Sequence, residues 1–123
     1  MREIQIRTKK RVLWTSAQAT TRGWERLVGI MFRSHLERPL LISFDRQAQQ
    51  TNAIHSLFCL VPFDAVFLDT QGRVVDIVRS IQPFRLLVTP RRSCSFVLET
   101  PQGQSGRLSI GDPLTFVPRK RSG

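Results

Sequence analysis

The sequence predicts a mainly β fold of the α+β class, in which a small antiparallel β-barrel-like domain carries one main short helix. The first observation is that apolar residues recur with period two in several short runs bounded by proline, glycine and polar turns. The second is that one stretch alone shows the 3.6-residue period of an amphipathic helix. With 123 residues, the chain favours a single domain that buries roughly two-thirds of its unfolded surface.

The first forty residues are predicted to hold an arm, one strand and the helix. Residues 1–11 are polar and basic, although two isoleucines alternate with charged residues and allow a short edge strand. Residues 12–14 predict the first core strand, and residues 16–21 predict a polar connection whose threonines can cap a helix. The helix is expected over residues 20–31, because four apolar side chains fall at helical spacing: Trp24, Leu27, Val28 and Met31.

After Pro39 the sequence changes to a period of two. This pattern predicts extended segments over residues 40–44, 53–58, 63–69, 73–81, 84–88, 94–99 and 114–117. A hairpin turn is expected at Asp69–Gly72, with a positive φ at the glycine. Residues 101–106 have turn composition with room for one helical turn, and residues 111–113 predict another turn.

Charge is the strongest signal in the composition. The chain has 19 Lys and Arg against 9 Asp and Glu, a net charge of +10. Residues 1–38 hold nine basic and three acidic side chains, residues 39–89 four of each, and residues 90–123 six and two. We therefore predict a basic N-terminal arm (1–11), one β-rich domain (12–118) and a basic C-terminal tail (119–123). Basic arms of this kind attract polyanions, although many basic surfaces serve only solubility.

The sequence also sets expectations about location and cysteine chemistry. No apolar run approaches the ~20 residues of a membrane span, and the first residues lack the apolar stretch of a secretory signal, so a cytoplasmic protein is expected. Cys59 and Cys94 stand 35 positions apart with no CxxC partner. Both are interpreted as small buried apolar residues rather than as a disulfide or a nucleophile.

Tests for metal, phosphate and acid–base chemistry leave few candidates. The two histidines and two cysteines are scattered, so no metal site and no cofactor is expected. Phosphate-binding glycine loops and recognisable nucleic-acid motifs are missing from the sequence. Among the carboxylates, Asp69 is explained by its turn, and Asp76 lies between Val75 and Ile77 where it can point to solvent.

Four ordered stretches carry a resemblance to a known family. Residues 54–78 begin Ile-His-Ser-Leu-Phe-Cys-Leu-Val-Pro-Phe-Asp, and residues 25–33 read Glu-Arg-Leu-Val-Gly-Ile-Met-Phe-Arg. Pro83-Phe84-Arg85 and the stretch from residue 97 to 103, followed by Gly111-Asp112, complete the set. Together they resemble the family called domain of unknown function 192. The resemblance implies a small, β-rich, barrel-like domain of bacterial or archaeal type and brings no established substrate, reaction or cofactor.

A cluster of polar residues is predicted at one end of the domain. Asp64 opens an apolar strand after Pro62, and Glu99 closes another, so each carboxylate must face water or find a partner. The candidates for a ligand site are Arg33, His55, Asp64, Arg85 and Glu99, of which the two arginines match the family pattern. The alternative, which the residues favour, is a set of structural ion pairs that fixes the strand ends.

Three functions follow as hypotheses. The first is a non-enzymatic module that binds a protein or small-molecule ligand through this cluster. The second is weak, salt-sensitive binding of nucleic acid or another anionic surface through the basic ends. The third is an enzyme of unknown reaction that uses His55 and Asp64 as acid–base groups. The residues predicted to bind polyanions are Lys9, Lys10, Arg11, Arg91, Arg92, Arg119, Lys120 and Arg121.

Overall fold

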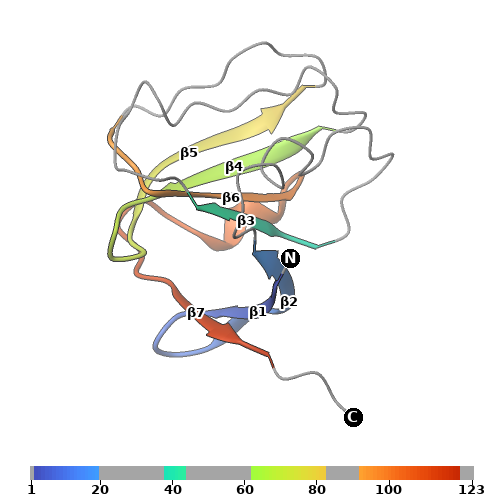
Figure 1. Cartoon of the computed structure of the whole chain (residues 1–123). Helices are drawn as coiled ribbons and strands as arrows, with labels where there is room; N and C mark the ends of the chain where they lie inside the picture. The colour runs from blue at the N-terminus through green and yellow to red at the C-terminus, as the bar shows by residue number, and fades with distance from the viewer. Residues whose placement is uncertain (1, 20–37, 44–61, 83–91, 120–123) are drawn as a thin grey trace.

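A computed structural model describes residues 2–19, 38–43, 62–82 and 92–119 (Figure 1). Seven strands form one sheet in the order β5-β4-β6-β3-β2-β1-β7. Their bounds are β1 (Arg2–Arg7), β2 (Val12–Ala19), β3 (Leu40–Ser43), β4 (Phe63–Leu68), β5 (Val74–Ile81), β6 (Phe96–Pro101) and β7 (Thr115–Pro118). A short 3-10 helix, η1 (Gln104–Arg107), follows β6 and confirms the helical turn expected there. The helix predicted over residues 20–31 lies outside the described residues, as do the extended segments at 53–58 and 84–88.

The sheet is β-rich as predicted, but it is not closed into a barrel. All neighbouring strands pair in antiparallel fashion except β2 and β3, which are parallel, so the sheet is mixed. The segment before β7 reaches the start of β5 through an isolated bridge between Arg73 and Pro113. Two backbone bonds flank this bridge, from Val74 N to the Asp112 oxygen and from Leu114 N to the Gly72 oxygen, each 2.9 Å. These contacts bring the two edges together at one end, but no continuous ladder joins β5 to β7.

The N-terminal segment, predicted to be a solvated arm, is an internal strand. β1 pairs with β2 on one side and with β7 on the other. Ile4 and Ile6 are 5% and 0% exposed. Their alternation with polar residues is the period of a strand with one buried face. Composition misled the boundary prediction, because Glu3 and Arg7 lie on the other face of β1 and Arg2 is exposed at its end.

The second strand also extends further than predicted. Residues 16–19, expected in a polar connection, belong to β2, and Ala17 is fully buried. The extension has a structural reason, because the parallel pairing with β3 begins at its end. There the amide of Gln18 donates to the carbonyl of Pro39, 2.9 Å away.

The remaining described strands confirm their predictions to within two residues. β3, β4 and β5 fall on predicted runs, and β4 and β5 form the predicted hairpin. In its turn, Asp69 Oδ1 accepts from the amides of Gln71 (2.9 Å) and Arg73 (3.0 Å). β6 begins at Phe96, two residues later than expected, and Cys94 before it is buried as predicted.

Alternation of side chains divides the sheet into two faces. On the inner face, one apolar cluster extends across the sheet from β1 and β2 to β4 and β6. It includes Ile6, Trp14, Val66 and Leu98. The outer face carries a second cluster over β3, β4 and β6, in which Phe63 and Phe67 are fully buried. On β1, β2 and β7 the outer face is half-buried or exposed. The strands β3, β4 and β6 therefore have a core on both faces, whereas β1, β2 and β7 have a core on the inner face alone.

The 3-10 helix covers the inner face beside β2. Trp14 Nε1 donates to the side-chain oxygen of Gln104 at 2.9 Å. Arg107 donates to the Leu13 carbonyl at 2.7 Å, and its guanidinium carbon lies 5.2 Å from the centre of the Trp14 ring. These contacts fix η1 against the β1–β2 hairpin.

We expect Gly72→Ala to be more destabilising than Gly103→Ala, although both glycines have positive φ, 80° and 87°. A Cβ at Gly72 would lie 2.7 Å from the Leu114 oxygen, whereas one at Gly103 would meet nothing within 4 Å. Gly103→Ala should lower the free energy of unfolding by about 1–2 kcal/mol, the cost of left-handed backbone for alanine. Gly72→Ala should cost about 1 kcal/mol more, because the two edges of the sheet must separate. Urea unfolding of both variants measures the difference, and equal losses would contradict the close approach.

Candidate functional site

Asp64 is a buried carboxylate that accepts four hydrogen bonds. It stands at the second position of β4, points to the inner face and is 0% exposed. Its Oδ1 accepts from the amide of Ser80 at 2.9 Å. Its Oδ2 accepts from the amide of Gly103 (3.0 Å) and from the amide and hydroxyl of Ser105 (3.2 and 2.6 Å).

The backbone around Asp64 is shaped to present these donors. Ser80 has a φ of 55°, unusual for a residue other than glycine, and Gly103 caps η1 with a φ of 87°. Both conformations turn an amide toward the carboxylate. Asp64 thus ties β4 to the end of β5 and to the start of η1. A buried carboxylate with four hydrogen bonds is a structural anchor, and a proton transfer to substrate would require breaking that network.

Glu99 lies on the opposite face of the sheet from Asp64. In the β4–β6 ladder Asp64 stands opposite Thr100, and Glu99 stands opposite Ala65. Successive side chains of a strand point to opposite faces. Glu99, which is 4% exposed, therefore points to the outer face with Leu40 and Ala65. The expectation that Asp64 and Glu99 gather in one cluster is wrong, because it considered strand ends and not register.

The other predicted members of the cluster are not placed. Arg33, His55 and Arg85 lie outside the described residues, and so does Cys59. Their association with Glu99 stays a prediction. Within residues 2–19, 38–43, 62–82 and 92–119, no group of three or more His, Cys, Asp or Glu is placed to hold a metal ion.

Asp76 does not point to solvent as expected. It is 3% exposed and stands opposite Phe67 in the β4–β5 ladder, which puts it on the outer face. The ladder has an irregularity between Asp76 and Val74. The shift breaks the simple alternation on which the expectation rested.

The basic residues predicted to bind polyanions are partly described. Lys9, Lys10 and Arg11 form the tip of the β1–β2 hairpin and are exposed. The tip is fixed by the backbone bond from Thr8 N to the Arg11 oxygen (2.9 Å), and the Arg11 amide donates to the Thr8 hydroxyl (3.3 Å). Arg92 and Arg119 are exposed on other elements. Arg91, Lys120 and Arg121 lie outside the described residues.

The described surface is more basic than the net charge indicates. The described residues include eleven Lys and Arg, of which ten are exposed and one, Arg7, is half-buried. They also include six Asp and Glu, of which three are buried and three half-buried. Three of the acids are buried in the sheet, and Asp69 and Asp112 accept backbone amides in turns. Most of the described carboxylates are thus buried or hydrogen-bonded within the fold, while the basic side chains face solvent.

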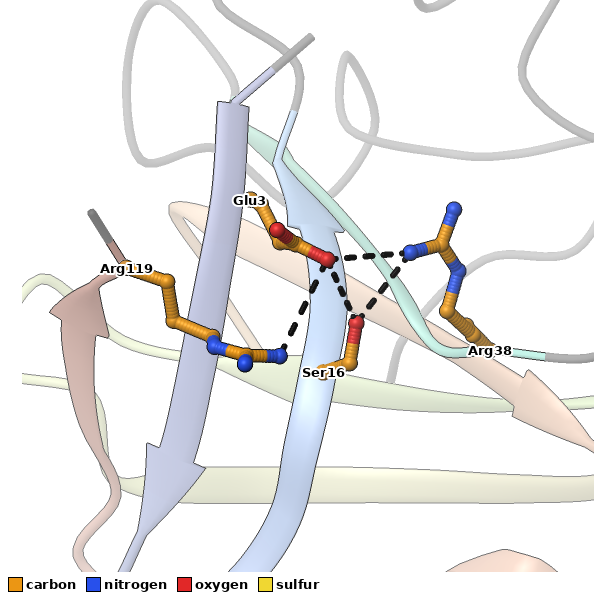
Figure 2. A network of polar contacts seen from close by, with 4 residues as sticks. All are labelled: Glu3, Ser16, Arg38 and Arg119. Atoms are coloured by element: carbon orange, nitrogen blue, oxygen red, sulfur yellow. Dashed lines mark hydrogen bonds and ion pairs between the residues drawn. The ribbon is translucent and has the colours of Figure 1, made fainter. Parts of the chain in front are cut away.

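Glu3 joins two arginines across the outer face of β1 and β2 (Figure 2). Its Oε1 accepts from the Ser16 hydroxyl at 2.8 Å and from Arg38 Nη1 at 3.2 Å. Arg119 Nη1 lies 3.8 Å from the same oxygen. The side chains of Glu3 and both arginines are 37–44% exposed, so the network is accessible to solvent. Ser16 stands two residues before Gln18, the partner of Glu3 in the β1–β2 ladder, and so is a diagonal neighbour of Glu3 on the same face.

Sequence reasoning missed Glu3, Arg7 and Arg38 as parts of one surface. The usable signal was the alternation of Glu3, Gln5 and Arg7 with isoleucines, which puts these three polar side chains on one face. Arg38 comes close to Glu3 because β3 pairs in parallel with β2, and nothing in the local sequence indicates that pairing.

Comparison with known proteins places the chain in a family. A model of the DUF192 family, described as an uncharacterized ACR, matches residues 4–116. The chain belongs to the DUF192 family. The match starts inside β1, in agreement with the place of that strand in the sheet. The resemblance found in the sequence is thereby confirmed.

Curated DUF192 relatives carry the name UPF0127 protein. The protein of Thermococcus sibiricus is 29% identical over 121 residues, covering 95% of this chain and 77% of the relative. That of Pyrococcus furiosus is 34% identical over 95 residues, covering 75% of this chain and 78% of the relative.

Two solved structures share the DUF192 fold of this chain. One is a candidate transcription regulator from Sinorhizobium meliloti 1021, with a TM-score of 0.80, 20% identity, and coverage of 94% of this chain and 92% of that one. The other is a protein of unknown function from Novosphingobium aromaticivorans, with a TM-score of 0.73, 19% identity, and coverage of 92% and 83%. At these identities the likeness concerns the fold alone. In the part of the chain that the structure describes, no helix is long and apolar enough to cross a membrane.

Proposed function

We propose that this DUF192 domain binds the phosphate backbone of nucleic acid, without sequence preference. One observation carries the proposal: ten of the eleven described Lys and Arg residues are exposed, whereas the six described acids are buried or half-buried. A surface on which positive charge predominates attracts polyanions, because few negative charges on it repel them. Because the described surface adds no aromatic platform to these charges, binding should be electrostatic and therefore weak at physiological salt.

Two alternatives have less support. A ligand site built on Glu99 with Arg33, His55 and Arg85 is supported by the burial of one carboxylate among apolar residues of the outer face. An enzyme that uses Asp64 as an acid–base group is disfavoured, because Asp64 is buried and both of its carboxylate oxygens already accept hydrogen bonds, one of them from the buried Ser105 hydroxyl.

The expected result is binding of a fluorescein-labelled 12-nucleotide oligothymidylate that weakens steeply with salt. If about five phosphates are neutralised, the slope of log K against log of salt concentration is about −3.5. Fluorescence anisotropy from 25 to 200 mM NaCl measures it. A random-sequence 12-mer serves as control and should bind with the same affinity to within about threefold. No binding at 25 mM NaCl, or a slope near zero, would contradict the proposal.

A further inference from the structure

Cationic side chains lie along β1 on the outer face of the part of the sheet formed by β1, β2 and β7. β1 lies between the other two, with Arg7 opposite both Val12 and Thr115. Its polar residues Glu3, Gln5 and Arg7 alternate with the buried isoleucines and so lie on the outer face. Figure 1 shows that these three strands form the end of the sheet farthest from β4 and β5.

The cations gather at the two ends of β1. At one end are Arg7 and the exposed hairpin tip of Lys9, Lys10 and Arg11. At the other end are Arg38 and Arg119, both on the carboxylate of Glu3 (Figure 2). Arg7 lies four positions after Glu3, which corresponds to roughly 13 Å along a strand. A nucleic-acid strand carries one phosphate per nucleotide, so a short stretch of backbone reaches from one cluster to the other.

Glu3 is the one acid within this surface among the described residues. It neutralises part of the charge of two arginines while no polyanion is bound. A phosphate has the same charge and offers more acceptor oxygens, so it can replace the carboxylate on Arg38 and Arg119. The carboxylate therefore competes with the phosphate for the same donors.

We propose that the outer face of β1, β2 and β7, with cation clusters at both ends of β1, is the surface that binds the phosphodiester backbone, and that Glu3 weakens this binding. The inference rests on the proposed function. It commits to nucleic acid because two cation clusters roughly 13 Å apart complement a chain of regularly spaced phosphates.

Matched charge reversals test the location. Lys9→Glu with Lys10→Glu changes the net charge by −4, as does Arg79→Glu with Arg92→Glu, at exposed arginines of β5 and of the segment before β6. We expect the first pair to weaken binding of the 12-mer at 50 mM NaCl by at least about 20-fold, because two phosphate contacts are lost and repulsion is added. The second pair should weaken it by less than about threefold, because only the long-range field changes.

Glu3→Gln tests the competing carboxylate. It keeps the shape of the side chain and a hydrogen-bond acceptor while removing the charge, and it should tighten binding about two- to fivefold. The affinity of oligothymidylates of 2, 4, 8 and 12 nucleotides should rise most steeply up to the length at which one strand reaches both clusters. Thermal unfolding by circular dichroism establishes that each variant is folded before its affinity is compared.

The outcomes separate the two proposals. If the wild type binds but both reversal pairs weaken binding equally, the location is wrong and nucleic-acid binding stands. If the wild type does not bind, the proposed function fails. Vesicles containing 30% phosphatidylserine are the second probe. If the protein binds these vesicles at 100 mM NaCl but binds no oligonucleotide, the surface is assigned to anionic lipid and both proposals are overturned.

Discussion

Replacing Asp64 with alanine is expected to lower the free energy of unfolding by about 3–5 kcal/mol, the largest effect of any single substitution considered. The change removes the acceptor of four hydrogen bonds, whose donors come from Ser80, Gly103 and Ser105. Ser105 is fully buried, so its amide and hydroxyl cannot turn to water. Each buried donor left without a partner costs about 1–3 kcal/mol, and collapse around the missing side chain recovers part of the sum. Urea unfolding measures the loss.

Asp69→Ala is the control for the loss of Asp64. Asp69 also accepts two backbone amides, but in a half-buried turn where water can take its place. Its removal should cost about 1 kcal/mol. If Asp64→Ala costs no more than Asp69→Ala, the description of Asp64 as a structural anchor is wrong. In that case, a role in ligand binding would regain support.

Removing residues 2–7 is expected to abolish cooperative unfolding. The truncation deletes β1, which is bonded to strands on both sides and contributes two isoleucines to the inner-face core. Burial of each isoleucine is worth about 2–4 kcal/mol. In addition, β7 would lose its partner in the sheet and β2 one of its two partners. The sum approaches the 5–15 kcal/mol that stabilises a typical domain. Near-ultraviolet circular dichroism and a melting curve measure the result.

Single substitutions on β1 distinguish the loss of a core strand from the loss of basic residues. Ile6→Ala should cost about 3 kcal/mol, since Ile6 is 0% exposed. Gln5→Ala, next to it on the half-exposed outer face, should change stability by less than about 0.5 kcal/mol. A truncated protein that melts within a few degrees of the full chain would restore the interpretation of this segment as a dispensable arm.

Local chemistry made much of the fold predictable. The hairpin of β4 and β5 follows from an apolar run, an aspartate that accepts the amides of its own turn, and Gly72 with a φ of 80°. Each of these is visible within about twenty residues of sequence. The arrangement of the whole sheet, which is not closed, was not predictable in this way. It depends on how Pro113 meets Arg73, forty positions away, and on the parallel pairing of β2 with β3.

The candidate site shows the same division between local and distant information. That Asp64 needs partners could be predicted from a carboxylate placed at the start of an apolar strand. Its partners could not, because the bonds to Gly103 and Ser105 cross 39 and 41 positions. Asp64 and Glu99 were grouped because both stand at strand ends. Register decides the face on which a side chain lies, and one residue of offset separates the two carboxylates.

The most direct test of the nucleic-acid surface is a titration of the ¹⁵N-labelled protein with a 12-nucleotide oligothymidylate at 50 mM NaCl, followed by the chemical shifts of backbone amides. The account predicts that the largest shifts map to residues 3–12 and 115–119 and to Arg38, with small shifts in β4 and β5. Shifts of equal size throughout the sheet, or largest shifts around Arg79 and Arg92, would contradict the assignment of the β1–β2–β7 outer face as the binding surface.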